Sequence, residues 1–535
     1  MSKNHLIYAT SFFCGMSVMA VELSASRLLA PYFGTSSIIW TIIIGLIMIS
    51  MSIGNIIGGR SADKYNSMGR LFFLIWIASL WIAAIPLFGK YVITLSVVLL
   101  MWVMPNNLLV AGSVLSCLAI FTFPLVILGM VSPYLVKLGV KSMQDNGKTT
   151  GKIYALSTIG SIIGTFVPTF FTIPYIGTGK TFFVFGLLLN LICLAYFSVK
   201  KLKTLRHAVS TLIILTLVLI PFKNTYAFWT KPVLEDESLY NYLQVSENKD
   251  SVVLSTNVAF GVQSIYMKDR TLSGLYYDYA LMAPFFMKDT ASNKSFNVLV
   301  LGMGTGTYAK ECKYFFPDSH IDGVEIDQKI VDLSKKYFEL KDNEADIFVN
   351  DGRTFLMGSE AGKYDVIMVD AYHDITIPFH MSTTEFFQEV KKHLNPGGVI
   401  MININMRSEK STEIIDYLSE TLKSNINRVY KYNVPYTTNT LVFSSDSEDM
   451  AEYLAQNASS LPAEHPLKAI AEEVQNNLTE VKSSAHVLTD DLAPVEVMGQ
   501  KVLDDIVADS LEDLKKQIGV SGGSLKDILD MVSGG

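Results

Sequence analysis

The sequence predicts a chain in two parts, a polytopic α-helical membrane half followed by a soluble α/β half built on a parallel sheet. Long apolar runs occupy the chain up to about residue 229. Between residues 296 and 404, short apolar strands instead alternate with amphipathic stretches. Charge divides at the same place, because residues 1–229 hold sixteen Lys or Arg and three acids, whereas the remainder holds 27 basic and 47 acidic residues. Two physical environments are needed to explain this division.

The acidity of the second half excludes one class of partner. Proteins bind phosphate backbones with clustered Lys and Arg, so nucleic acid is not expected as a partner. Cationic substrates are compatible with the acidity, although acidic surfaces also serve simply to keep a domain soluble. The four cysteines are dispersed and predict neither a metal site nor a disulfide framework.

The first half contains apolar runs of membrane-spanning length. Crossing the hydrocarbon core takes about 20 apolar residues, and two of the runs, with about 15 residues, could be short spans or interfacial segments. We expect seven or eight crossings from these segments: Leu6–Leu23, Ser37–Gly58, Leu71–Gly89, Tyr91–Pro105, Leu108–Val136, Ile153–Ile176, Thr181–Val199 and Ala208–Phe222.

The second half predicts a Rossmann-like core. Five parallel strands are expected at Phe296–Leu301, His320–Val324, Ala345–Val349, Tyr364–Val369 and Val399–Ile404. The first strand runs into a glycine-rich loop, Gly302, Met303, Gly304, Thr305 and Gly306. Glycines there permit a tight turn and let backbone N–H groups approach a ligand at the start of the next helix. Alone, this motif is a weak signal.

Acidic residues at the ends of the next strands strengthen it. Glu325 ends the second strand about 20 residues on, where a carboxylate accepts both ribose hydroxyls of a nucleotide. NAD-binding folds share that spacing. Asp351 and Gly352 follow the third strand, where S-adenosyl enzymes hold the adenine amino group, and Asn395–Gly398 precedes the fifth. Together these features favour an S-adenosyl nucleotide and a domain of the S-adenosylmethionine methyltransferase type.

The second half also resembles the spermidine synthase family of aminopropyltransferases, in its membrane-fused bacterial branch. The likeness covers roughly Glu235–Glu496. It includes two segments similar to the family's small N-terminal β-domain, a tyrosine cluster, a catalytic loop and a closing motif. These are Glu235–Tyr242, Asn257–Ser264, Tyr276–Tyr279, Asp370–Asp374 and Leu488–Pro494. The resemblance implies four parts: a transmembrane domain (1–229), the small β-domain (230–290), the nucleotide-binding catalytic domain (291–450) and a helical extension (451–535).

The resemblance implies a reaction and roles for residues. Decarboxylated S-adenosylmethionine carries a sulfonium whose aminopropyl carbon is open to in-line attack by a polyamine amine. That amine, an ammonium with a pKa of about 10, must first lose a proton. Asp370 would be the general base and Asp374 would pair with a charged substrate nitrogen. Further substrate contacts are implied at Gln263, Tyr276, Tyr277 and Asp278, and cofactor contacts at Gly302, Gly304, Thr305, Gly306, Glu325, Asp351 and Gly352. No metal is required.

Departures from the family pattern leave two alternatives. The family has an Asp in the glycine-rich loop, where this chain has Thr305, which cannot neutralise the aminopropyl ammonium. The catalytic loop is one residue longer between its acids, and Tyr277 replaces a glutamine. An S-adenosylmethionine-dependent methyltransferase on the same fold is therefore the main alternative, with His373 or Tyr372 at its acceptor site.

A transporter with a soluble nucleotide-binding domain is the second alternative. The stretch Ser52–Lys64 resembles the glycine-rich loop of major-facilitator transporters, and Thr158–Gly164 partly echoes it. Small residues at such spacing also simply let helices approach closely. Glu22 and Arg27, near the end of the first span, suggest a polar cavity, an ion pair or side chains that reach the interface.

Two arguments conflict about the side of the membrane on which the soluble half lies. Basic loops favour the cytoplasm, and the three are Arg60–Arg70, Lys137–Lys152 and Lys200–Arg206. If Ala208–Phe222 then crosses, the soluble half lies outside, where an adenosyl cofactor is scarce. We expect a multi-pass protein of the cell membrane with a cytoplasmic catalytic domain, and with Ala208–Phe222 not fully spanning. A polyamine, the lipid bilayer and a second copy in a homodimer are the partners considered.

Overall fold

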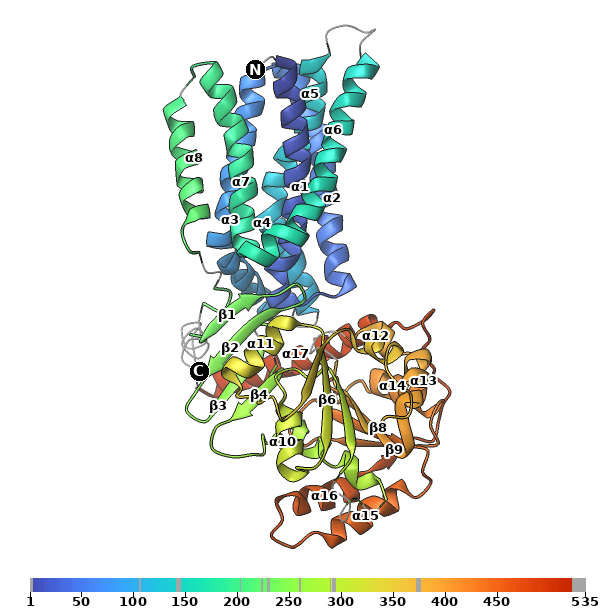
Figure 1. Ribbon diagram of the computed structural model, residues 1–535. Helices are drawn as coiled ribbons and strands as arrows, with labels where there is room; N and C mark the ends of the chain where they lie inside the picture. The colour runs from blue at the N-terminus through green and yellow to red at the C-terminus, as the bar shows by residue number, and fades with distance from the viewer. Residues whose placement is uncertain are drawn as a thin grey trace. The chain divides into compact units, whose positions relative to one another are not determined.

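A computed structural model of the chain describes two compact units (Figure 1). The described residues are 3–104, 107–140, 146–202, 204–222, 225–228, 231–258, 261–288, 290, 295–371 and 377–521. The first unit comprises Met1–Trp229 and Glu235–Tyr242, and the second comprises Thr230–Leu234 and Leu243–Gly535.

The first unit is a bundle of long apolar helices. They are α1 (Lys3–Phe33), α2 (Ser37–Tyr65), α3 (Met68–Val103), α4 (Leu108–Gly129), α5 (Val131–Gly139), α6 (Asn146–Val167), α7 (Ile173–Val199) and α8 (Thr204–Leu219). By length and composition, five helical stretches among the described residues can cross a membrane, and the fifth, Asn146–Val199, contains both α6 and α7. The helix α8 is apolar but shorter.

One membrane prediction is wrong in detail. Leu71–Gly89 and Tyr91–Pro105 were expected as separate segments, but α3 is one continuous helix of 36 residues. Lys90 interrupts the apolar run without interrupting the helix, because lysine is a good helix former. The eight expected segments therefore form seven helical segments in the described part of the bundle, with α4 and α5 counted together.

Small residues bring helices of the bundle into backbone contact. A Cβ added to Gly160 of α6 would lie 2.0 Å from the carbonyl oxygen of Phe12 in α1, and one added to Gly164 would lie 2.1 Å from that of Met16. A Cβ on Gly54 of α2 would similarly lie 2.3 Å from the carbonyl oxygen of Val126. The glycine-rich stretches thus serve close helix packing, the plainer of the two interpretations of that pattern.

Hydroxyl and amide side chains link α3, α7 and α8. Asn190 donates to the hydroxyl of Ser79 at 3.0 Å, and its carbonyl oxygen accepts from Ser210 at 3.1 Å and from Thr211 at 2.7 Å. All four residues are buried. This cluster is electrically neutral, which suits a bundle whose helices have the length and composition of membrane spans.

The short segment Glu235–Tyr242 is bonded into the first unit through its acids. Glu235 accepts hydrogen bonds from the backbone N–H of Tyr226 at 2.6 Å and from the hydroxyl of Tyr242 at 2.6 Å. Glu237 accepts from the hydroxyls of Tyr226 and Thr178. Arg27, predicted to need a polar partner, donates to the carbonyls of Ser238 and Leu239.

A four-stranded sheet in the order β1-β2-β3-β4 follows the helices in the chain. Its strands are β1 (Leu234–Glu237), β2 (Tyr242–Glu247), β3 (Ser251–Ser255) and β4 (Ser264–Met267). Leu243, Val245, Val252 and Leu254 form a core with apolar residues of the helix α11 (Gln328–Tyr337).

The main sheet has eight strands in the order β12-β10-β11-β9-β8-β5-β6-β7. They are β5 (Asn297–Leu301), β6 (His320–Glu325), β7 (Asp346–Val349), β8 (Tyr364–Val369), β9 (Leu394–Ile404), β10 (Arg428–Asn433), β11 (Thr440–Ser445) and β12 (Thr479–Glu480). β5 to β9 pair in parallel, which confirms the five predicted strands. Asn395–Gly398, expected before the fifth strand, lies inside β9.

Helices cover both faces of this sheet, because residues of β5 alternate between two cores. Val298 and Val300 belong to one core and Leu299 and Leu301 to the other. The first is covered by α9 (Tyr276–Ala280), α10 (Thr307–Phe315), α15 (Met450–Ser460) and α16 (Pro466–Asn477). The second is covered by α12 (Gly352–Met357), α13 (Thr384–His393), α14 (Glu413–Lys423) and α17 (Val495–Ser521). The order of strands reverses between β5 and β8, where a crevice opens at the carboxyl ends of the strands.

Candidate active site

The glycine-rich loop makes a tight turn between β5 and α10. Gly302, Gly304 and Gly306 all have positive φ angles, of 88°, 57° and 85°. A Cβ on Gly302 would lie 2.6 Å from the carbonyl oxygen of Asp370, so only glycine fits where this loop passes the end of β8. The loop therefore presents backbone, without side chains, at the switch point of the sheet.

Glu325 ends β6 beside this loop. Its carboxylate accepts hydrogen bonds from the backbone N–H groups of Gly304 at 2.9 Å and Asp327 at 3.0 Å. Burial raises the pKa of Glu325 to about 7, although these backbone hydrogen bonds act in the opposite direction. Each oxygen of a carboxylate can accept a further hydrogen bond, as ribose hydroxyls would require.

Asp351 follows β7 and caps the helix α12. Its carboxylate accepts from the backbone N–H of Thr354 at 2.8 Å and lies 3.2 Å from Nε2 of His380. Partial burial acts to raise the pKa of Asp351, but the hydrogen bonds from Thr354 and His380 outweigh it and lower the pKa. Gly352 follows with no side chain, where a Cβ would lie 3.0 Å from Met381.

Asp370, at the end of β8, is held on both oxygens. The hydroxyl of Tyr276 donates to one oxygen at 2.7 Å, and the amide of Asn403 donates to the other at 2.7 Å. Asn403 in turn accepts a hydrogen bond of 2.8 Å from the amide of Asn439. Burial, reinforced by the Asp370 carboxylate, holds the pKa of Tyr276 well above its usual range, so Tyr276 remains a hydrogen-bond donor.

The other predicted substrate residues lie near Tyr276 in different environments. The hydroxyl of Tyr277 donates to the backbone carbonyl of Gln263 at 2.9 Å. Asp278 is 5% exposed and accepts hydrogen bonds from Ser273 and Gly274, so its carboxylate is occupied within the protein. Substrate contact at Tyr277, Gln263 and Asp278 stays a prediction. Asp374, together with the alternative acceptor-site residues His373 and Tyr372, lies outside the described residues.

Thr305 occupies the centre of the glycine-rich loop. Its side chain is 1% exposed, and its hydroxyl oxygen has no hydrogen-bond partner among the described residues. Its backbone N–H donates to the hydroxyl of Ser264 at 3.1 Å. The position is therefore neutral, as expected from the sequence.

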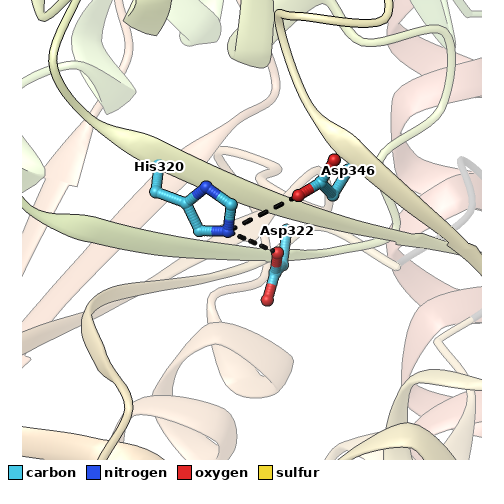
Figure 2. Close-up of side chains that lie close together, drawn as sticks. All are labelled: His320, Asp322 and Asp346. Atoms are coloured by element: carbon cyan, nitrogen blue, oxygen red, sulfur yellow. Dashed lines mark ion pairs between the residues drawn. The ribbon is translucent and has the colours of Figure 1, made fainter.

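One group of side chains has the composition of a metal site, but it lies away from the crevice. His320, Asp322 and Asp346 stand at the starts of β6 and β7, and their ligand atoms lie within 4.8 Å of one another (Figure 2). Nε2 of His320 is 3.1 Å from Asp322 and 3.6 Å from Asp346. The other oxygen of Asp322 is 2.6 Å from Nζ of Lys363, an ammonium that competes with a cation. We interpret the group as an ion-pair cluster at the edge of the sheet opposite the crevice.

Sequence reasoning missed several residues that fix these groups. Asn403 and Asn439 were not singled out, although an amide near the end of the otherwise apolar strand β9 is a signal of a buried polar contact. Arg353, directly after Gly352, forms a bidentate ion pair with Asp490 of the closing motif, at 2.8 and 2.6 Å. That pair ties the motif at Leu488–Pro494 to the helix that Asp351 caps.

The strand order and the groups at the strand ends define a Rossmann-like domain of the S-adenosyl-nucleotide type. A family model described as the spermine/spermidine synthase domain matches residues 282–456. A probable polyamine aminopropyl transferase of Bifidobacterium longum is 45% identical over 335 residues, which cover 59% of this chain and 73% of that protein. A polyamine aminopropyltransferase of Vibrio vulnificus is 27% identical over 282 residues, covering 49% of this chain and 90% of that protein.

The solved structure of spermidine synthase from Thermotoga maritima matches with 18% identity and a TM-score of 0.37, covering 46% of this chain and 82% of that chain. On the extent of its likeness to the Bifidobacterium longum protein, the chain belongs to the spermidine synthase family.

Proposed function

We propose that this chain is a transferase that moves an aminopropyl group from decarboxylated S-adenosylmethionine to a polyamine amine, with Asp370 as the general base. The observation that carries the proposal is the setting of Asp370 at the switch point of the sheet. Its carboxylate is fixed between the hydroxyl of Tyr276 and the amide of Asn403, each at 2.7 Å. A base held on both sides keeps one orientation, which is what proton removal from an incoming amine requires.

The proposed reaction is a single in-line displacement. The amine nitrogen forms a bond to the aminopropyl carbon while the bond from that carbon to the sulfonium breaks, and the electron pair leaves with sulfur as neutral methylthioadenosine. The proton lost by the amine passes to Asp370. The glycine-rich loop would hold the adenosyl part, with Glu325 on the ribose and Asp351 on the adenine amino group. The Asp374 role and the substrate contacts of Gln263, Tyr277 and Asp278 remain part of the proposal.

Because of Thr305, a methyltransferase is the second candidate function. A neutral, buried side chain replaces the acid that the family uses for the aminopropyl ammonium. Intact S-adenosylmethionine carries a carboxylate as well as an amine at that end, so a neutral residue suits it better.

Product analysis separates the two activities. Purified full-length protein is incubated with a diamine and either decarboxylated or intact S-adenosylmethionine. We expect methylthioadenosine and a longer polyamine from the decarboxylated cofactor, and no product from Asp370→Asn. The exposed Asp318, which makes no hydrogen bond among the described residues, provides the matched control Asp318→Asn. S-adenosylhomocysteine as the sole product would contradict aminopropyl transfer.

The contacts of α8 support a further membrane crossing, contrary to the expectation from sequence. The guanidinium of Arg206 lies 4.9 Å from the ring of Trp76, near the start of α3, and Nζ of Lys90 donates to Thr225 at 2.7 Å. Trp76 and Lys90 are separated by roughly 21 Å along a helix, and Lys90 lies between two apolar stretches of α3. The chain from Arg206 to Thr225 thus runs beside α3 from Trp76 to Lys90.

If α8 crosses, the chain that follows it lies on the side opposite the three basic loops, which the positive-inside tendency assigns to the cytoplasm. The scarcity of an adenosyl cofactor outside the cell argues for the other side, and we propose the extracytoplasmic side because it agrees with the contacts of α8. Single cysteines at Lys148, in a basic loop, and at the exposed Glu360 test this with a membrane-impermeant maleimide, because the four native cysteines are buried. Labelling of Glu360→Cys in intact cells, but of Lys148→Cys only after permeabilisation, is expected. The reverse pattern would restore the cytoplasmic assignment.

A further inference from the structure

Two buried carboxyl groups, one on each of the helices α9 and α10, accept a hydrogen bond from the same backbone N–H. Asp278 of α9 is 5% exposed and Glu311 of α10 is 3% exposed. Both acids accept a hydrogen bond from one donor, because the backbone N–H of Ser273 lies 2.9 Å from Oδ1 of Asp278 and 3.1 Å from Oε1 of Glu311. Burying two acids at one donor is costly unless one of them keeps its proton.

The hydrogen-bond partners of the two acids show which of them keeps its proton. Asp278 has three donors: the N–H and hydroxyl of Ser273 and the N–H of Gly274, at 2.9, 2.7 and 2.9 Å. Glu311 has the one shared N–H, and its Oε2 has no partner among the described residues. Burial raises the pKa of Glu311 well above its usual range, and the neighbouring Asp278 raises it further. Of the two acids, Glu311 is therefore the one that holds its proton more strongly.

The segment that these acids hold leads directly to the catalytic base. Ser273 and Gly274 precede Leu275, the residue before α9, and Gly274 has a φ of 81°, in the left-handed region. The first residue of α9 is Tyr276, whose hydroxyl donates to Asp370. Fixing the loop at Ser273 and Gly274 thus fixes the backbone position of Tyr276, whose side chain orients Asp370.

We propose that Glu311 is a positioning residue, which shares its proton with Asp278 and thereby locks residues 273–278 so that Tyr276 reaches Asp370. The lock is a property of the fold, and its effect on turnover rests on the proposed aminopropyl transfer. Glu311 lies on α10, the helix that begins at the glycine-rich loop, so the lock also joins the nucleotide-binding and base-orienting sides of the crevice.

No other titratable group around Glu311 takes over the role of its proton. The phenols of Tyr277 and Tyr308 and the thiol of Cys312 have pKa values raised by burial, so they stay neutral. The nearest cations are engaged with carbonyls: Lys310 donates to those of Phe338 and Glu339, and Arg270 to that of Ser273. No Lys or Arg forms an ion pair with Glu311 in the described part of the chain.

The sign of the pH effect follows from the raised pKa of Glu311. The pKa of Glu311 in the folded protein lies above that in the unfolded chain, so the lock is complete below this raised pKa. It is lost as the pH rises through the raised pKa, because two carboxylates then share one N–H. Glutamine cannot ionise and still offers an N–H to Asp278, so Glu311→Gln should keep the lock at every pH.

The test compares three variants of the full-length protein: Glu311→Gln, Glu311→Ala and, as a control, Glu360→Gln at an exposed glutamate. We expect Glu311→Ala to lower kcat about ten-fold, with little change in KM for the nucleotide, because orientation of the base is lost. Glu311→Gln should keep the wild-type kcat near pH 7 and remove the alkaline loss of activity that wild type and Glu360→Gln share.

Amide hydrogen exchange over residues 270–281 separates failure of the lock from failure of the proposed function, since it needs no turnover. The protection factor at Ser273 and Gly274, which corrects for the faster intrinsic exchange at high pH, should be low in Glu311→Ala and high in Glu311→Gln. It should fall at alkaline pH only where Glu311 is present. The proposal is overturned if Glu311→Gln exchanges like Glu311→Ala, or if the pH profiles of Glu311→Gln and wild type coincide. The pH profile of Glu311→Gln tests the proposal even if Glu311→Ala does not fold.

Discussion

The two units of the chain bury polar groups of different kinds. In the membrane unit, the cluster around Asn190 consists of amide and hydroxyl groups that satisfy one another without charge. In the second unit, the carboxyl groups of Glu325 and Glu311 are buried and that of Asp370 is half-buried, each beside backbone N–H groups or neutral donors. Desolvating a neutral group costs far less than desolvating an ion.

This difference separates packing from chemistry. Neutral groups that pair across helices stabilise a bundle modestly and tolerate a lipid surrounding. Buried carboxyl groups are kept at a cost, and each can change its protonation state or its partner when a ligand arrives. Substitutions in the soluble unit should therefore change activity and its pH dependence, whereas those in the membrane unit should change stability.

The largest effect is expected at Asp370. Asp370→Asn removes the base while it keeps the shape of the side chain, so the rate of methylthioadenosine formation should fall about 10²–10⁴-fold. Initial rates at saturating substrates measure this, and the melting temperature should stay near that of wild type. An Asn variant that retains a tenth of the activity would show that another group takes the proton.

The next largest effect is expected from backbone contact in the membrane unit. In Gly160→Val the new Cβ would lie 2.0 Å from the carbonyl oxygen of Phe12, which forces α1 and α6 apart. A loss of about 3 kcal/mol in the free energy of unfolding is expected. Denaturation in detergent micelles measures it. Gly151→Val on the same helix is the control, because a Cβ at Gly151 meets no atom within 4 Å. Equal losses for both variants would mean that valine in the helix, and not the contact, is responsible.

An intermediate effect is expected from the ionisation of Glu325. Its pKa is raised to about 7, so the ligand-free protein is destabilised as the pH rises through 7, where Glu325 loses its proton. Ribose hydroxyls donate to the ionised form, so the affinity for methylthioadenosine should rise up to about ten-fold per pH unit below pH 7 and level off above it. Calorimetric titrations between pH 6 and 8 measure this, with Glu325→Gln expected to bind weakly and without pH dependence. A flat wild-type profile would exclude Glu325 from ribose binding.

The smallest effect is expected at the neutral cluster. Asn190→Leu removes three hydrogen bonds but introduces no charge, and hydrogen bonds between membrane helices contribute about 0.6 kcal/mol each on average. A loss of about 1–2 kcal/mol is expected in the same denaturation assay. Asn55→Leu, at an exposed asparagine of α2, should show no loss. Loss of transferase activity in Asn190→Leu without loss of stability would contradict the division between the two units.

Sequence patterns located the ends of the strands because strands are local. Gly302, Glu325 and Asp370 end or directly follow an apolar strand and Asp351 is the second residue after one, so periodicity located these positions, whereas the role of Asp370 came from the resemblance to the family. The groups that hold Asp370 are distant along the chain, since Tyr276 precedes it by 94 residues and Asn403 follows it by 33. No spacing rule connects them, and the sheet order brings them together.

Lys90 shows another limit of sequence patterns. The charge of Lys90 divided an apolar run, and nothing in a hydropathy pattern distinguishes the end of a span from one lysine in a continuous helix. The homodimer and the transporter remain predictions, which light scattering and proteoliposome uptake would measure.

The bonds of Glu235 and Glu237 bear on how the catalytic half can be isolated. Composition changes near residue 230, and a truncated gene would naturally start there. Such a protein would begin with two acids stripped of the Tyr226 and Thr178 groups that hold them. β1 is an edge strand of its sheet, and an exposed edge strand is a site for aggregation. A cut at the change in composition is therefore a poor starting point for expression trials. Better ones keep residues 225–242 together with the helices, or replace both acids by glutamine.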